Sequence, residues 1–323
     1  MADLQTEYLG LKLKNPIIAG SSNLSGNSES IKKLEDAGAG AVVLKSIFEE
    51  QILRESGNLT GEFFDHAEEY DYISQYTRQF NVEKYLALIK EAKKSVNIPI
   101  IASINCVSDG EWTTFAKKIE AAGADAIELN IFILPGDFQQ AGNDIENIYF
   151  KIIDAVKKAV KIPISIKVSH YFSGLANMIF RLSLTGIKGI VLFNRFYSPD
   201  IDLEKMELIS SDIYSSQREN SLVLRWIGMM SGNVKCDLAS STGIHSGTDV
   251  IKNILVGSKA VQVVSALYKS GPGHISVMLK EMDSWLNSHN YNSLNDIRGK
   301  LSQEKVANPS IYEQVQFMKY FSV

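Results

Sequence analysis

The feature that most constrains the fold is an alternation of short β-rich runs with stretches of helical spacing along the whole chain. The β-rich runs are Asn15–Gly20, Ala41–Lys45, Ile98–Ile104, Ala124–Asn130, Ile162–Val168, Gly189–Asn194, Cys236–Ser241 and Ala260–Ser265. Eight strand–helix units within 323 residues predict an α/β protein with a TIM (β/α)8 barrel, rather than an open doubly wound sheet.

Apolar residues recur at intervals of three and four between these runs, which is the spacing of helices that cover a barrel. Tyr85, Leu86, Ile89 and Ala92 show it within the expected helix Val82–Val96. The other expected helices are Ser28–Ala37, Glu111–Ala122, Asp144–Val160, Ser221–Met230 and Gly273–Leu286. Because no Pro/Gly/Ser-rich linker divides the chain, we expect residues 1–323 to form one domain rather than several α/β domains.

Two segments exceed the minimal strand–helix unit. Phe48–Phe80 is a long aromatic and acidic insertion after the second strand, and Tyr197–Asn220 follows the sixth. Both are expected on the carboxyl-terminal face of the barrel, where loops build the active site.

Composition restricts the partners and the compartment. The formal net charge is -4 without a block of like charges, which argues against nucleic acid as the main partner. The distant Cys106 and Cys236 form no zinc or redox pair, as expected in a reducing cytoplasm. No signal peptide and no apolar run long enough to span a bilayer is present, so we expect a cytoplasmic protein without membrane contact.

Polar residues stand where the predicted strands end. Lys45-Ser46, Asn105, Asn130, Lys167 and Asn194 stand at the carboxyl-terminal ends of the middle strands, and Gly20-Ser21 stands at the end of the first. Lysine is rarely buried without a partner, so two lysines with three amides indicate a cup for a planar heterocycle with an anionic tail. Any one of these residues alone would be read as a solvated loop residue, and the functional interpretation depends on their coincidence.

The loops after strands seven and eight add a candidate phosphate site. Ser240–Gly247 is rich in small residues and leads into a helix, so backbone N–H groups and the helix end could meet an anion. Val264-Ser265 stands at the carboxyl-terminal end of the eighth strand. The pair of loops is the usual position of a phosphate site in TIM barrels.

These residues and their order resemble the dihydroorotate dehydrogenase family, nearest to its soluble class and over nearly the whole length. The matching segments are Asn15–Ser21, Ala39–Ser46, Glu128–Asn130, Pro163–Lys167, and Gln262–Leu267 with Gly271-Pro272. The resemblance implies bound FMN and an oxidoreductase acting on a small-molecule substrate. It implies FMN contacts from Gly20, Ser21, Lys45, Ser46, Asn105, Asn130, Lys167, Asn194, Thr242, Gly243, Val264 and Ser265.

The chain departs from the family pattern where the substrate should bind. The position of the catalytic Cys or Ser base is held by Ile133, which cannot accept a proton. The family's amide-rich substrate loop after strand two is not recognisable in Ser74–Gln79, and its Asn-Ser after strand six is Asn194-Arg195. The FMN half of the site is therefore kept better than the orotate half.

Other residues offer only weak replacements for the base. Cys106 and Tyr197 are the candidates, while His170 and Tyr171 are more readily explained as loop and packing residues. His66 and His245 lack ligand partners at metal spacing, and we predict no metal.

Three functional hypotheses follow. The first, which we favour, is an FMN oxidoreductase of this type with an altered substrate or weak dihydroorotate activity. The second is a true dihydroorotate dehydrogenase of pyrimidine biosynthesis with a non-standard base. The third is a non-catalytic FMN-binding protein. We expect a homodimer in each case.

Overall fold

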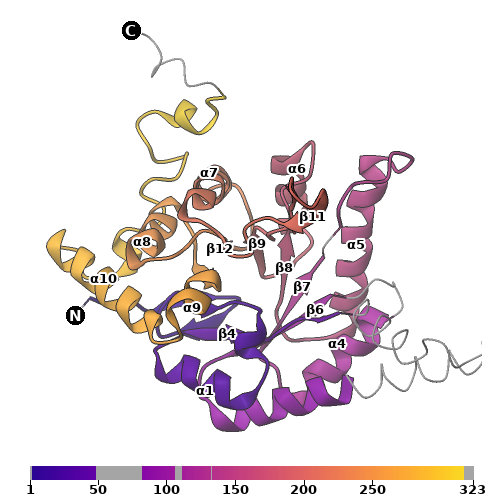
Figure 1. Ribbon diagram of the computed structural model, residues 1–323. Coiled ribbons are helices and arrows are strands. Elements are labelled where there is room, and N and C mark those ends of the chain that lie inside the picture. The colour runs from indigo at the N-terminus through magenta and orange to yellow at the C-terminus, as the bar shows by residue number, and fades with distance from the viewer. Residues whose placement is uncertain (1, 49–81, 106–110, 132, 316–323) are drawn as a thin grey trace, which may run out of the picture.

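The computed structural model describes residues 2–48, 82–105, 111–131 and 133–315. Figure 1 shows strands at the centre of the molecule with helices around them. The strands are β1 (Thr6–Tyr8), β2 (Leu11–Leu13), β3 (Ile17–Ala19), β4 (Ala41–Val43), β5 (Ile47–Phe48), β6 (Ile100–Asn105), β7 (Ala126–Asn130), β8 (Ile164–Val168), β9 (Gly189–Leu192), β10 (Pro199–Asp202), β11 (Glu207–Ser210), β12 (Asp237–Ser241) and β13 (Ala260–Val263).

The helices alternate with the barrel strands along the chain. They are α1 (Ser28–Asp36), a helix over residues 82–95, α4 (Glu111–Ala122), α5 (Gly142–Ala159), α6 (Leu175–Ser183), α7 (Asn220–Met230), α8 (Gly247–Val256), α9 (Ser265–Ser270) and α10 (His274–Ser288). No helix in these described ranges is both long and apolar enough to cross a membrane.

The barrel closes through eight parallel strands. Their order around the barrel is β3, β4, β6, β7, β8, β9, β12 and β13, and β13 pairs with β3. The two-residue strand β5 adds a second short pairing to β6 beyond the end of β4. This arrangement confirms the predicted TIM barrel.

Two apolar clusters hold the barrel together. The larger lies between the strands and the helices, where Ile127 and Leu129 of β7 are fully buried. The smaller fills the amino-terminal end of the barrel interior, which the β1–β2 hairpin closes with Tyr8 and Leu9. Alternation along β7 turns Ala126, Glu128 and Asn130 inward, so polar side chains occupy the interior above the apolar layer.

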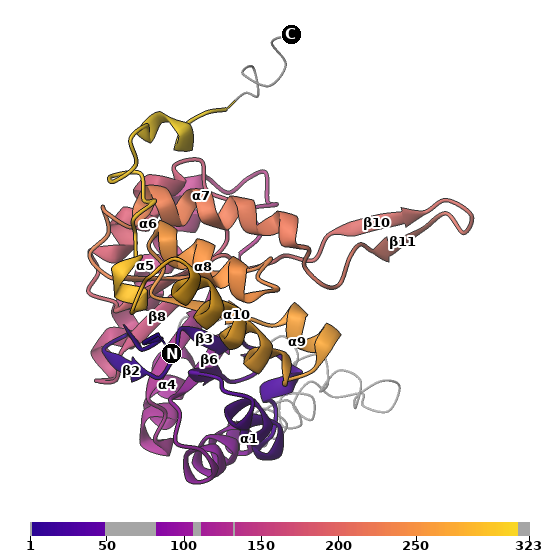
Figure 2. The ribbon, with the colours of Figure 1, turned by 90° about the vertical axis from the view of Figure 1, so that its left-hand side faces the viewer.

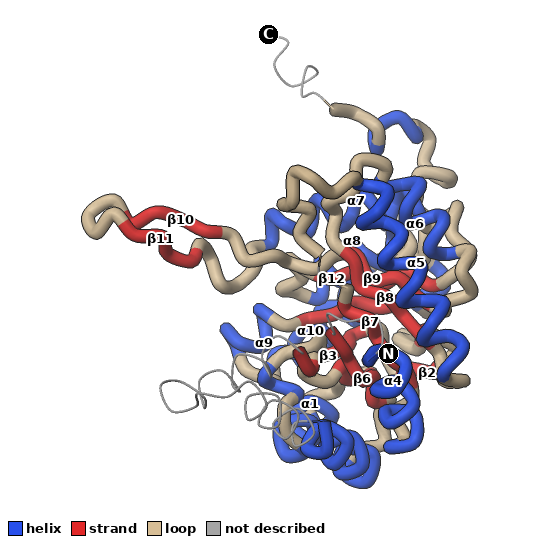
Figure 3. Tube along the Cα trace, turned by 90° about the vertical axis from the view of Figure 1, so that its right-hand side faces the viewer, coloured by secondary structure: helices blue, strands red, loops and turns tan. Residues whose placement is uncertain are grey.

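The structure corrects the expected elements at two places. The eighth strand ends at Val263 rather than Ser265, because Ser265 is already the first residue of α9. The insertion after strand six contains a two-stranded ribbon, β10–β11, that projects away from the barrel in Figures 2 and 3. The insertion Phe48–Phe80 lies outside the described residues beyond Phe48.

Candidate functional site

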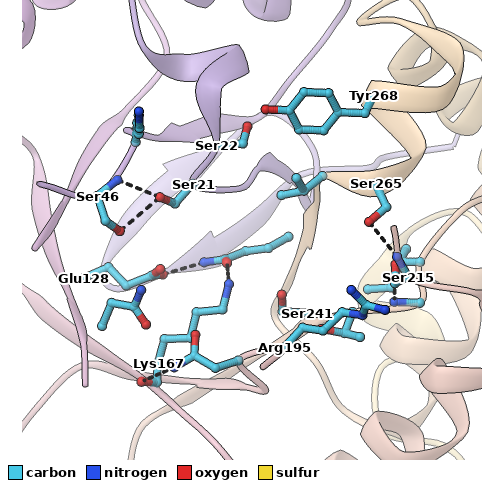
Figure 4. Close-up of a pocket in the computed structure, with 18 of the residues that line it drawn as sticks. Ser21, Ser22, Ser46, Glu128, Lys167, Arg195, Ser215, Ser241, Ser265 and Tyr268 are labelled. Atoms are coloured by element: carbon cyan, nitrogen blue, oxygen red, sulfur yellow. Dashed lines mark hydrogen bonds between the residues drawn. The ribbon is translucent and has the colours of Figure 1, made fainter. Parts of the chain in front are cut away.

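A cavity of about 450 Å³ opens at the carboxyl-terminal ends of the strands. Most of the residues expected to contact the cofactor line it, and Figure 4 shows several of them converging on the same space. Those that line the cavity are Ser21, Lys45, Ser46, Asn130, Lys167, Asn194, Thr242, Gly243, Val264 and Ser265. The register of a closed parallel barrel brings them together from segments distant in the sequence.

Two expected contact residues do not line the cavity. Gly20 lies behind Val264, and a Cβ at Gly20 would stand 2.7 Å from Val264 Cγ2. Glycine is therefore required there for packing of the cavity wall. Asn105 ends β6 in register with Phe48 of β5, beside the segment whose structure is not described.

Hydroxyl groups connect the first three barrel strands at the cavity rim. Ser21 Oγ accepts a hydrogen bond from the Ser46 backbone N–H at 2.9 Å, and Ser46 Oγ lies 2.6 Å from Ser103 Oγ. The chain fixes the turn after β4 in this way, and this turn carries Lys45. In the described part of the chain, the Lys45 ammonium has no hydrogen-bond or ion-pair partner. Its charge is thus available to a ligand in the cavity.

The floor of the cavity contains a linked set of buried polar groups. Lys167 Nζ donates to Gln262 Oε1 at 2.8 Å, and Gln262 Nε2 donates to Glu128 Oε2 at 2.5 Å. Burial raises the pKa of Glu128 and lowers that of Lys167, and each charge opposes the shift of the other. Beside them, Asn130 Oδ1 is buried with no hydrogen-bond partner within the described residues.

The opposite side of the cavity is built by Ser215, which lies just before α7. Its Oγ accepts from the Gly243 backbone N–H at 3.3 Å, and its own N–H donates to Ser265 Oγ at 3.0 Å. The loops after β12 and β13 are joined through this one buried serine. Gly243 has a φ of +74°, and a Cβ there would stand 2.4 Å from the Asn220 backbone nitrogen.

The amino end of α8 is not free to meet an anion, contrary to the expectation from the Ser240–Gly247 loop. Gly247 N–H donates to Glu281 Oε2 at 2.6 Å, and Asp249 accepts from the backbone N–H of His245 and Ser246. Only the earlier part of the loop, Ser241 to Ile244, lines the cavity. An anion bound on this side of the cavity would therefore be held by the loop from Ser241 to Ile244 and by Ser265.

Arg195 fixes the segment that follows the ribbon to the cavity rim. Its guanidinium donates to Glu219 Oε2 at 2.8 Å and to the carbonyl oxygens of Ile213 and Asp212 at 2.9 and 2.6 Å. Arg195 lines the cavity from the position where the resembling family has a substrate-pairing serine. Since three N–H groups are already used, two remain for a ligand.

None of the expected replacement bases in the described residues lines the cavity. Ile133 packs against the core, and Tyr197 is 67% exposed with its hydroxyl donating to the Ile209 carbonyl oxygen. Burial lowers the pKa of His170, whose Nδ1 has no described partner. Cys106, His66 and Ser74–Gln79 lie outside the described residues. In the described ranges, no cluster of three His, Cys, Asp or Glu side chains is placed to hold a metal ion.

Sequence reasoning missed several residues that line the cavity. They include Glu128, Arg195, Ser215, Gln262 and Tyr268. Glu128 could have been found, because it is two residues before Asn130 and faces the same side of a strand. Ser215 had a weaker signal: the capping box Ser216–Glu219 marks the entry to the following helix directly after it.

Comparisons with known proteins agree on one family. The family model for dihydroorotate dehydrogenase matches residues 3–286. The catalytic subunit of dihydroorotate dehydrogenase B (NAD(+)) from Thermoplasma volcanium is 26% identical over 306 residues, covering 93% of this chain and 98% of the relative. The same subunit from Methanocaldococcus jannaschii is 27% identical over 297 residues, covering 89% and 94%. The PreA subunit of NAD-dependent dihydropyrimidine dehydrogenase from Escherichia coli is 25% identical over 320 residues, covering 92% and 76%.

Proposed function

The chain belongs to the dihydroorotate dehydrogenase family, and from this premise we propose that it is an FMN-dependent oxidoreductase. Its substrate is a small, pyrimidine-like molecule that changes oxidation state at a CH–CH bond. The names of the relatives support this class, because one group acts on dihydroorotate and another on dihydropyrimidines.

The cavity is the observation that carries the proposal of FMN. Its volume of about 450 Å³ lies in the usual range for cofactor sites. Lys45 and Lys167 supply positive charge, and the buried Asn130 Oδ1 has no hydrogen-bond partner among the described residues, a role that a ligand N–H would fill. Bound FMN would supply hydride acceptance, a chemistry that the protein side chains do not have.

We assign the two ends of the cofactor to the two sides of the cavity. The ring and ribityl chain are assigned to Ser21, Lys45, Ser46, Asn130, Lys167 and Asn194. The phosphate is assigned to Thr242, Gly243, Val264 and Ser265, with Ser215 holding their loops together. Gly20 contributes by letting Val264 approach, while Asn105 remains a proposed contact.

The substrate half of the site accounts for an altered activity. Oxidation of dihydroorotate requires loss of a proton together with a hydride, and Ile133 cannot take the proton. In the described region Tyr197 is directed to a backbone carbonyl rather than to the cavity. The proposed substrate therefore differs from dihydroorotate, or dihydroorotate reacts slowly.

A ligand titration followed by a substrate panel tests this function. The protein stripped of small molecules is titrated with FMN and with riboflavin, and FMN is expected to bind more tightly because of its phosphate. The FMN-loaded protein is then mixed anaerobically with dihydroorotate, dihydrouracil and dihydrothymine, and flavin bleaching is followed. Equal affinity for FMN and riboflavin contradicts the phosphate assignment. FMN that no pyrimidine donor bleaches indicates the non-catalytic alternative.

We also propose a homodimer in which the ribbon packs against a second copy. Ile201 and Leu208 are paired, 58% and 75% exposed, and project from one face, whereas the next pair, Asp202 and Glu207, projects from the other. An isolated two-stranded ribbon is marginally stable, and an apolar face matched to itself suits a two-fold interface.

Light scattering of the eluting protein tests the dimer. Leu208→Lys is expected to give monomers, because it places a charge within the apolar face. Glu207→Lys introduces the same side chain on the acidic face and is expected to leave the dimer intact. A monomeric wild-type protein, or equal effects of the two changes, contradicts the proposal.

A further inference from the structure

Three barrel strands contribute one continuous polar link below the cavity. Glu128 belongs to β7, Lys167 to β8 and Gln262 to β13. The Gln262 amide lies between the two charged groups, with its oxygen 2.8 Å from Lys167 Nζ and its nitrogen 2.5 Å from Glu128 Oε2. Figure 4 shows Glu128 and Lys167 on the same side of the cavity, joined by this bridge.

We propose that Glu128 is a positioning residue that, through Gln262, keeps Lys167 charged and fixed at the cavity floor. The inference rests on the proposed function only in its consequence for FMN, because the charge of Lys167 can be measured in protein that holds no ligand. Glu128 itself is 1% exposed, so its effect on a ligand is expected to pass through Lys167.

The Gln262 side-chain amide is oriented so that its oxygen faces the Lys167 ammonium and its nitrogen faces the Glu128 carboxylate. A glutamine carbonyl accepts from an ammonium, and its amide group donates to a carboxylate. The other carboxylate oxygen of Glu128, Oε1, has no hydrogen-bond partner in the described chain. Glu128 therefore depends on Gln262 and on the field of Lys167, and Lys167 depends on them in turn.

Burial makes this dependence strong. A buried ammonium tends to lose its proton unless an opposite charge is close, and Glu128 is the charge that counters this tendency at Lys167. Among the described residues, the other titratable groups near Glu128 are the phenols of Tyr8 and Tyr85, both buried and with raised pKa values. Lys45, from the turn after β4, also lines the cavity. Since the phenols are neutral near pH 7, neither can replace the carboxylate.

The consequence concerns negative charge on a ligand. A charged Lys167 stabilises an anionic group in the cavity, including negative charge that develops on a reduced flavin ring. A neutral Lys167 loses this effect without any change in the shape of the cavity. Replacing Glu128 by Gln thus separates charge from packing, because the two side chains have nearly the same size.

The direct experiment is a titration of Lys167 in ligand-free protein with isotope-labelled lysine, followed by NMR. The Lys167 signal is assigned by its loss in Lys167→Met. In Glu128→Gln and in Gln262→Leu, the proton affinity of Lys167 is expected to fall at least about tenfold. Asp237→Asn is the matched control, because Asp237 is a partly buried carboxylate at the opposite end of the barrel and lies outside the cavity lining.

A second readout uses FMN-loaded protein. Glu128→Gln is expected to weaken the preference for reduced over oxidised FMN about tenfold, which lowers the two-electron midpoint potential by about 30 mV. An unchanged Lys167 titration in both Glu128→Gln and Gln262→Leu overturns the inference. Wild-type protein that takes up no FMN refutes the proposed function instead, and leaves the lysine titration to decide the inference. If Glu128→Gln does not fold, Gln262→Leu provides the same test.

Discussion

Replacing Lys45 by Ala tests the cavity as a ligand site. Lys45 follows β4, lines the cavity and is half-buried without a hydrogen-bond or ion-pair partner in the described residues. A bound FMN that accepts a hydrogen bond from this ammonium would lose about 1.5–3 kcal/mol of binding energy in Lys45→Ala. The dissociation constant should therefore rise about 10- to 160-fold.

The same change should leave the ligand-free fold almost unaffected. Because Lys45→Ala removes no hydrogen bond or ion pair within the described residues, the free energy of unfolding should change by less than about 0.5 kcal/mol. In contrast, Lys167→Ala leaves Glu128 buried without its countercharge, and should cost about 3–5 kcal/mol. Flavin fluorescence titration measures the affinity, and urea unfolding measures the stability.

Lys12 on β2 provides the control for this experiment. It is exposed at the amino-terminal end of the barrel, away from the cavity, and Lys12→Ala should change neither affinity nor stability. If Lys45→Ala binds FMN as tightly as the wild type, the charge of Lys45 does not serve this ligand. A large loss of stability in the ligand-free variant would show that Lys45 supports the fold instead.

Three further changes give distinct outcomes. Dihydroorotate should reduce the bound flavin at least about 100-fold more slowly than in a relative that has the catalytic base. The change Ile133→Cys alone should not restore the full rate, and stopped-flow absorbance measures both rates. Gly243→Ala should destabilise the ligand-free protein by more than about 1 kcal/mol in urea unfolding, because its φ of +74° and the nearby Asn220 nitrogen exclude a Cβ. His170→Phe should reduce the fall in melting temperature between about pH 7 and pH 5.

The expected direction of the His170 effect on stability at acid pH follows from its pKa, which burial lowers. The unfolded state takes up the proton first, so stability is present above the unfolded pKa of about 6.5 and is lost as pH falls through the lower folded value. A variant with the same acid dependence as wild type would exclude His170 as a cause.

Gly136→Ala is the control for Gly243→Ala, since its Cβ would meet no atom within 4 Å. Rapid bleaching of the unmodified protein by dihydroorotate would direct the search for a base to Cys106, which lies outside the described residues, because Tyr197 does not line the cavity.

The barrel could be predicted because its pattern is local and repeated. Each inner strand alternates between residues that face the helices and residues that face the interior, as in Ile127 and Glu128 of β7. The boundary at Ser265 failed because the continuous run Ala260–Ser265 fits a strand, whereas the helical turn after Val263 is set by tertiary packing. The ribbon was not predicted either, since its apolar Ile201 and Leu208 cover no core.

The residues that line the cavity could be predicted only where they stand at the end of a recognisable strand. Lys45, Asn130 and Asn194 each end a recognisable β-rich run, and a barrel brings such positions together on one face. The link from Glu128 to Gln262 joins residues 134 apart in sequence, and it depends on barrel register. The sequence also does not show that the Asp249 and Glu281 carboxylates accept hydrogen bonds from backbone N–H groups at the amino end of α8. This helix end was therefore predicted to be open to an anion, although its N–H groups are occupied.

The measurement closest to the central claim is the absorbance spectrum of the purified protein, with the released ligand identified by mass. The cavity holds Lys45, Lys167 and Asn130 Oδ1, which has no hydrogen-bond partner in the described parts of the chain, and it therefore predicts a flavin spectrum, with FMN as the released compound at about one per chain. Colourless protein that also fails to bind added FMN would contradict the account.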